Sequence, residues 1–219
     1  MHSPFSVLFF LLLVSALIAT FQLGILTIAF AKLGLSPSSA LVILLASFVG
    51  SFINIPLFKM KSNQPVSLQT PIWLKNFFRS PPRLFEGFTY IHVNVGGCLI
   101  PLLVTFYLLQ QADFDLALLL FAIFLMTTLS YSFSRPITGI GIGMPVFLAP
   151  FAAAIIALIL APQHSAVLAY ISGTLGVLIG ADLLRLRDIK RMGTSFASIG
   201  GAGTFDGIFI TGIVAALLA

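Results

Sequence analysis

The chain is dominated by apolar segments about as long as a membrane is thick. A helix needs about 20 consecutive apolar residues to cross the hydrocarbon core of a bilayer. Such segments recur along the 219 residues, separated by short runs rich in Pro, Gly, Ser or charged side chains. The sequence therefore predicts about seven helical spans, at roughly 5–31, 38–58, 95–111, 115–133, 145–161, 165–184 and 199–218.

The composition supports a membrane fold over a soluble one. Hydrophobic residues make up 59% of the chain and charged residues 8%, whereas soluble domains contain about 45–50% and about 25%, respectively. A soluble fold of this length cannot bury so much apolar surface. We expect an all-α integral membrane protein, a single domain over residues 1–219, with Gly-rich breaks on the cytoplasmic side.

The basic residues predict how the spans are oriented. The net charge is +5, from eleven Lys and Arg against six Asp and Glu. With seven spans, Lys32 lies on one side, and the other side holds Lys59, Lys61, Lys75, Arg79, Arg83, Arg135, Arg185, Arg187, Lys190 and Arg191. Because cytoplasmic loops are enriched in Lys and Arg, we expect an inner-membrane protein with a cytoplasmic N-terminus and an external C-terminus. Orientation and anionic headgroups explain the positive charge without nucleic acid.

Residues 59–94 form the longest polar segment between predicted spans. Aromatic side chains alternate there with cations, as in Trp73, Lys75, Phe77 and Arg79. This mixture is typical of a segment that lies in the membrane interface. We therefore expect an interfacial cytoplasmic loop, with a gate or a substrate-docking element as the alternative.

Two aspartates are predicted to lie within spans, where ionisable residues are costly and often functional. Asp182 lies near the cytoplasmic end of the sixth predicted span, and Asp206 near the cytoplasmic start of the seventh. Because a short loop joins these spans, both carboxylates would lie at similar depth on antiparallel neighbours. Two close carboxylates share a proton, so that one acts as base toward water and the other as acid.

A structural interpretation of the same residues remains open. Asp182 is one turn from Arg185 and could pair with it or with Arg187. Asp206 could cap a helix or accept hydrogen bonds from the Gly-rich backbone beside it. Glycines in spans also serve ordinary close packing.

Further polar and Gly-rich positions are predicted on the same side. Irregular backbone at membrane depth is tolerated where protein or water covers it, so the Gly-rich stretches 95–97, 139–143 and 200–207 indicate a water-accessible cytoplasmic cavity. The candidate site-lining residues are His92, Asn94, Arg135, Gly200, Gly201, Gly203 and Gly207.

Other kinds of site are not indicated by the sequence. Its one cysteine, Cys98, lies in an apolar segment and excludes a disulfide framework. The sequence shows no metal-ligand spacing, phosphate loop or dinucleotide fingerprint, so we predict no metal and no cofactor. The expected partners are the lipid bilayer and either another membrane protein or a second copy of the chain.

Several motifs together resemble one known family. The C-terminal stretch IGADLLRLRD…SIGGAGTFDGIFITGI, the run NVGGCLIP at 94–101 and the Arg-Pro…Gly-Ile-Gly…Pro pattern at 135–145 resemble a prokaryotic membrane-protein family, domain of unknown function sixteen-fourteen. The resemblance covers most of the chain. It implies a multi-span inner-membrane protein and no particular activity.

A weaker similarity is to intramembrane aspartyl proteases of the presenilin and prepilin-peptidase type. These place one aspartate on one span and a second in a Gly-x-Gly-Asp motif on another, which Asp182 and Asp206 would match. This sequence departs from that pattern, because Ala181 precedes Asp182 in place of Tyr and two residues separate Gly203 from Asp206. No Pro-Ala-Leu motif follows Asp206.

Three functions are therefore compatible with the sequence. The favoured one is an intramembrane aspartyl hydrolase-like site at Asp182 and Asp206 near the cytoplasmic face. The first alternative is a proton- or cation-coupled transporter of small solutes, in which the same aspartates bind the ion. The second is a non-catalytic accessory subunit of a membrane complex.

Overall fold

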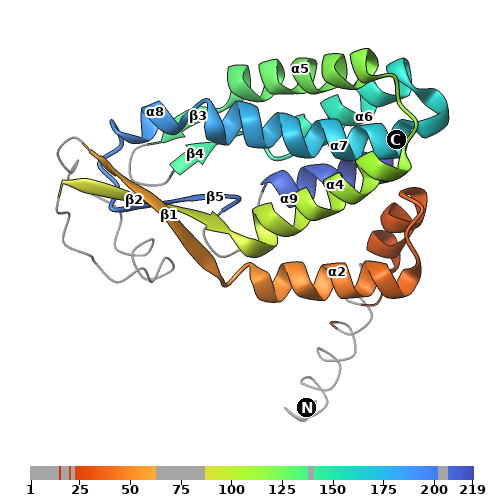
Figure 1. Ribbon diagram of the computed structural model, residues 1–219, viewed down its shortest axis with the longest axis horizontal. Helices are drawn as coiled ribbons and strands as arrows, with labels where there is room; N and C mark the ends of the chain where they lie inside the picture. The colour runs from red at the N-terminus through yellow and green to blue at the C-terminus, as the bar shows by residue number, and fades with distance from the viewer. Residues whose placement is uncertain (1–14, 16–19, 21–22, 63–86, 138–140, 202–206) are drawn as a thin grey trace, which may run out of the picture.

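The computed structural model describes residues 15, 20, 23–62, 87–137, 141–201 and 207–219. Its helices form an elongated body, and a small three-stranded sheet lies at one end of it (Figure 1). We call this end of the body the sheet end and the opposite one the far end.

The helices run back and forth between the two ends, so that α4, α5, α6 and α7 are successively antiparallel (Figure 1). The bounds are Leu23–Lys32, α2 Pro37–Gly50, α4 Ile100–Gln111, α5 Leu116–Phe133, α6 Leu148–Leu160, α7 Ser165–Val177, α8 Leu186–Ile189 and α9 Gly207–Leu218. Two π-helices, η1 Val95–Leu99 and η3 Leu178–Leu183, lead into α4 and continue α7, and the short 3₁₀ turn η2 Pro162–His164 precedes α7. The largely helical architecture agrees with the predicted fold class.

Among the described residues, two helical stretches are long and apolar enough to cross a membrane by themselves, Leu116–Phe133 and the continuous stretch Pro162–Ile189. The bent pair of Leu23–Lys32 and α2, whose axes differ by 116°, is a third candidate. The apolar helices Val95–Gln111, Leu148–Leu160 and Gly207–Leu218 are shorter. At about 1.5 Å per residue the shortest extends about 18 Å, against about 30 Å of hydrocarbon. Seven spans therefore stays a prediction.

The three-stranded sheet was not predicted from the sequence. It consists of β1 Asn54–Lys61, β2 Phe88–Asn94 and β5 Phe196–Ile199, in the order β1-β2-β5. β1 is antiparallel to β2, and β2 is parallel to β5. Consequently helix α2 ends at Gly50, earlier than the predicted span 38–58, and α9 starts later than the predicted span 199–218.

A second, two-stranded sheet follows α5. Its strands are β3 Arg135–Ile137 and β4 Gly141–Gly143, which pair antiparallel with Arg135 opposite Gly143. β3 begins where α5 ends, because Ser134 after the last helical residue has extended backbone geometry. The predicted Gly-rich stretch 139–143 therefore includes a strand, while residues 138–140 lie outside the described residues.

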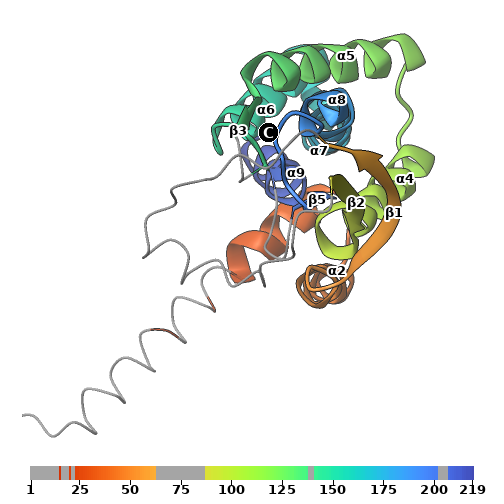
Figure 2. The ribbon, with the colours of Figure 1, turned by 90° about the vertical axis from the view of Figure 1, so that its left-hand side faces the viewer.

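Helix α7 is enclosed by its neighbours. Viewed from the sheet end, it lies among α4, α5, α6 and α9 (Figure 2), and most of its residues are buried. Glycines allow this close packing, because a Cβ at Gly176 or Gly180 would overlap Met126 or Thr127 of α5. Small residues serve the same purpose between membrane helices generally.

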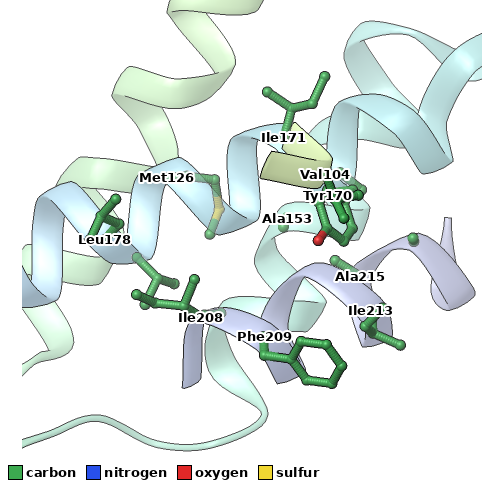
Figure 3. Close-up of a cluster of buried hydrophobic side chains, with 14 of the residues drawn as sticks. Val104, Met126, Ala153, Tyr170, Ile171, Leu178, Ile208, Phe209, Ile213 and Ala215 are labelled. Atoms are coloured by element: carbon green, nitrogen blue, oxygen red, sulfur yellow. The ribbon is translucent and has the colours of Figure 1, made fainter. Parts of the chain in front are cut away.

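The interior is filled by apolar side chains from several helices. Figure 3 shows Met126 of α5, Tyr170 of α7 and Ile213 of α9 in one cluster, with Leu178 of η3 beside Ile208 at the start of α9. In contrast, the outer faces carry exposed apolar side chains, such as Ile159, which is 73% exposed. A buried core with an apolar exterior is what a lipid-embedded body requires.

Contacts at the far end confirm the antiparallel arrangement. Lys32 donates from Nζ to the carbonyl of Leu217 near the end of α9, at 2.8 Å. Phe114 and His164, from the α4–α5 and α6–α7 connections, have ring centroids 6.0 Å apart. Asp115 caps α5 by accepting from the Ala117 amide at 3.2 Å.

Candidate functional site

Asp182 lies on η3, the π-helical continuation of the enclosed helix α7. Its side chain is half-buried, and Oδ2 accepts a hydrogen bond from the Gly200 amide at 3.3 Å. A π-helical turn inserts an extra residue into a helix and is often found at functional sites. Asp182 is therefore held at the junction between helix and sheet at the sheet end.

Gly200 and Gly201 follow directly after β5. Both have left-handed backbone geometry, with φ of +79° and +86°, which glycine adopts without steric cost. A Cβ on Gly200 would come within 2.5 Å of the Cys98 Cβ, and one on Gly97 would overlap the Gly200 carbonyl. Two segments distant in sequence thus approach backbone to backbone, and the glycines permit that contact.

Asn94 ends β2 at the start of η1 and is fully buried. Its Nδ2 donates to the Ser51 carbonyl at 2.7 Å and to Asn54 Oδ1 at 3.1 Å. Its Oδ1 accepts from the Gly97 amide at 2.7 Å. The predicted site residue Asn94 is therefore satisfied by protein groups and fixes where β2 becomes η1.

Two further residues near Asn94, Asn54 and Ser198, were missed by the sequence analysis. Ser198 Oγ donates to Asn54 Oδ1 at 2.7 Å, joining β5 to the start of β1. Asn54 and Asn94 lie opposite each other in the β1–β2 register. The alternation of apolar residues in FTYIHVN was a usable signal for β2. No local signal connects Ser198 to Asn54, which is 144 residues away.

We define the junction cluster as Asp182, Gly200, Asn94, Gly97, Asn54 and Ser198. It lies where the parallel strands β2 and β5 reach their carboxyl ends, next to η1 and η3. Four of the described predicted site residues, His92, Arg135, Gly201 and Gly207, are not in it, although His92 pairs with Ser198 across β2 and β5. His92 lies on β2 with its ring centroid 4.4 Å from that of Phe196, and exposed Arg135 belongs to the two-stranded sheet.

Asp206 and Gly203 lie outside the described residues. Their relation to Asp182 therefore stays a prediction, as does the role of the catalytic pair. Gly207, which follows Asp206 in the chain, is the first residue of α9, and α9 packs along α7. The glycines described at this end, Gly97 and Gly200, mark tight backbone contact, and the predicted water-accessible cavity stays untested.

Arg185 binds groups other than those of the junction cluster. Its guanidinium contacts Asp188 Oδ2 at 3.0 Å, as an ion pair, and donates to the carbonyls of Tyr131 and Ser134 at 2.7 and 2.8 Å. It also lies over the Tyr131 ring at 4.1 Å. Arg185 thereby caps the last carbonyls of α5, and it was not among the predicted site residues.

Within the described part of the chain, no three His, Cys, Asp or Glu side chains are grouped closely enough to hold a metal ion. Cys98 is buried, as expected for a small packing residue. The chemistry of the described cluster is therefore that of one carboxylate, two carboxamides and a hydroxyl.

Comparison with known proteins identifies a family. The family described as "Protein of unknown function (DUF1614)" matches residues 48–218, most of the chain. The chain belongs to this family. The match starts within α2 and ends at the last residue of α9, so the sheet, both π-helices and the junction cluster all lie inside the DUF1614 region. The resemblance seen in the sequence is thereby confirmed.

No curated protein and no solved structure shows a significant match to this DUF1614 member. The similarity to intramembrane aspartyl proteases therefore rests on the placement of two aspartates in the sequence.

Proposed function

We propose that this DUF1614 protein is a multi-pass membrane protein whose sheet end faces the cytoplasm. The support is the separation of charge between the two ends. Among the described residues, Lys32 is the only basic residue at the far end. The elements at the sheet end carry Lys59, Lys61, Arg135, Arg185, Arg187, Lys190 and Arg191. Such an asymmetry favours the basic side as cytoplasmic.

Cysteine labelling in intact cells tests this orientation. In a Cys98→Ser background, Lys61→Cys places a thiol at the sheet end and Asp113→Cys places one at the far end. A membrane-impermeant maleimide should label position 113 in intact cells and position 61 only after permeabilisation. The reverse pattern would contradict the orientation, and labelling of both positions in intact cells would contradict a membrane between the two ends.

We further propose that Asp182 and Asp206 form a hydrolytic pair at the sheet end. The observation that carries this proposal is the contact of Asp182 with Gly200, the start of the short segment that leads to Asp206. From Gly201 the chain has five residues to reach Asp206, and the next residue begins α9 beside α7. Chain connectivity thus favours two carboxylates near the same junction.

Such a pair would hydrolyse an amide or ester by acid–base chemistry. One carboxylate accepts a proton from the attacking water, and the other carboxyl donates a proton to the substrate oxygen. The Gly200 amide orients the Asp182 carboxylate for this role. The helices next to this pair, α7 with its continuation η3 and α9, are apolar. The substrate class that fits is therefore a membrane-embedded polypeptide.

A peptide that mimics the tetrahedral intermediate tests the proposal. We would use a hydrophobic peptide containing statine, a photoreactive group and biotin, because such analogues bind their enzymes about 100-fold or more tightly than substrates. Labelling of the purified protein should be lost in both Asp182→Asn and Asp206→Asn. The matched control is Asp188→Asn, which changes an aspartate at the same end and should leave labelling unchanged. Absent labelling of the wild type, or equal labelling of all variants, would refute the hydrolytic pair.

A carrier is the second candidate, favoured by two π-helical turns within continuous helices. The π-helices η1 and η3 both lie at the sheet end, and π-helical turns are frequently found at functional sites. In that case Asp182→Asn would abolish proton- or cation-dependent flux in proteoliposomes while the statine peptide fails to label the wild type. An accessory subunit would show neither labelling nor flux in the wild type.

A further inference from the structure

An open apolar groove of about 580 Å³ lies between the end of α5 and the start of α6. It is lined by Leu129, Phe133, Pro145, Phe147, Leu148, Phe151, Ala152 and Ile155. All eight side chains are apolar, and Phe147 and Ile155 are 69% and 55% exposed. The lining offers no polar partner, so it suits a hydrocarbon chain.

A cationic side chain lies at the sheet end of this groove. Phe133, at the end of α5, is followed two residues later by Arg135 on β3. Arg135 pairs across the small sheet with Gly143, and Pro145 follows Gly143 by two residues. The Arg135–Gly143 pair is thus flanked on both strands by groove residues, and Arg135 itself is exposed.

We propose that the α5–α6 groove is a binding site for an anionic phospholipid. One acyl chain lies along α6 from Phe147 to Ile155, a distance of about 12 Å, and the phosphate lies against the guanidinium of Arg135. Arg presents donors that match phosphate geometry. The net negative charge of its headgroup distinguishes this occupant from zwitterionic phosphatidylcholine, because the choline cation offsets the attraction between the phosphate and Arg135. The proposal is independent of the hydrolytic pair.

Quenching by brominated lipid measures occupancy at chosen positions. The single tryptophan is first removed by Trp73→Phe, and a new one is introduced by Ile155→Trp in the groove. Ile159→Trp is the matched control, because Ile159 is also an exposed residue of α6 but does not line the groove. Each protein is reconstituted in phosphatidylcholine with increasing brominated phosphatidylglycerol. The fluorescence then gives the relative binding constant of the two lipids at that position.

At position 155 we expect phosphatidylglycerol to be preferred by about fivefold, the effect of one favourable cation–phosphate contact. Arg135→Gln should abolish that preference, so that both lipids bind about equally, and Arg135→Lys should retain most of it. Arg187→Gln, which removes a charge from exposed Arg187 in α8, should have no effect. Position 159 should show no preference in any variant.

Three results would overturn the proposal. Equal affinity of both lipids at position 155 would mean that the groove holds ordinary bulk lipid. A preference that survives Arg135→Gln would remove the assigned headgroup contact. A preference of equal size at positions 155 and 159 would indicate a general attraction of anionic lipid to the basic end. Circular dichroism and gel filtration of each variant establish that loss of preference is not loss of folding.

Discussion

The helical interior and the junction cluster differ in whether their buried polar groups have hydrogen-bond partners. In the interior, the hydroxyls of Ser130, Ser172 and Thr174 are buried without a hydrogen-bond partner among the described residues. In the junction cluster, Asn94 is equally buried, but its amide makes three hydrogen bonds to two different segments.

The difference shows what specifies each region. Around α7, small and apolar residues determine how closely α5, α7 and α9 pack. At the sheet end, strands and π-helices leave backbone groups that no regular helix satisfies. Specific side chains must satisfy them, so single polar substitutions should be far more damaging there.

The strongest test of this contrast removes one buried polar side-chain group from each region. Asn94→Leu leaves the Ser51 carbonyl and the Gly97 amide buried without their partner, at about 1–3 kcal/mol each, while Asn54 Oδ1 keeps the Ser198 hydroxyl. We expect a loss of about 4 kcal/mol in the free energy of unfolding, measured by circular dichroism in mixed micelles.

The interior counterpart is Thr174→Val, which removes an unpartnered hydroxyl at constant shape. We expect stability to be unchanged or raised by about 1 kcal/mol, because burying a hydroxyl without a hydrogen bond is unfavourable. If Thr174→Val proves as damaging as Asn94→Leu, the proposed contrast between the two regions is wrong.

The second comparison concerns glycines with positive φ. Gly200→Ala forces an unfavourable backbone conformation, which costs about 1–2 kcal/mol, and makes the new Cβ overlap Cys98, which costs about 1–3 kcal/mol. We therefore expect the free energy of unfolding to fall by about 3 kcal/mol. Gly34→Ala has a similar φ of +76° but nothing within 4 Å of the new Cβ. Gly34→Ala should lower the free energy of unfolding only through its unfavourable backbone conformation, by about 1 kcal/mol. Equal losses in the two variants, measured by the same unfolding assay, would show that close packing at Gly200 is unimportant.

Arg185 caps the end of α5 outside the junction cluster and should show an intermediate effect. Arg185→Lys keeps the charge but loses the planar donors that reach Tyr131 and Ser134, and we expect a loss of about 1.5 kcal/mol. Asp188→Asn removes only the ion pair, whose groups are partly exposed, and should change stability by about 0.5 kcal/mol or less. A larger effect of Asp188→Asn than of Arg185→Lys would assign the stabilisation to the ion pair instead of the helix cap.

Much of the helical framework was predictable because each apolar run is informative by itself. The predicted segments 95–111 and 115–133 agree closely with Val95–Gln111 and Leu116–Phe133. The charge asymmetry was likewise readable, since it depends only on counting Lys and Arg between spans. The ion pair of Asp188 with Arg185 is local as well, because the two residues lie within one helical turn.

The sheet could not be predicted in the same way, because its strands pair residues distant in the chain. β2 and β5 are parallel neighbours although about a hundred residues separate Ile91 from Ala197. Short apolar runs of this kind do not reveal by periodicity whether they form a strand or continue a helix. The predicted site stays a prediction. Among its described residues, Asp182, Asn94 and Gly200 belong to the junction cluster, His92 pairs with Ser198 across β2 and β5, and Arg135 lies in the two-stranded sheet.

The apolar character of the chain, its mostly helical structure and the gathering of its cations toward one end could be read from the sequence, because these properties sum over local residues. The fold was needed to show that Asp182 meets Gly200, that Asn94 bonds to the α2–β1 connection and to η1, and that Arg135 lies at the end of an apolar groove. Each of these contacts depends on how distant segments approach, and close packing fixes that approach only when the whole chain has folded.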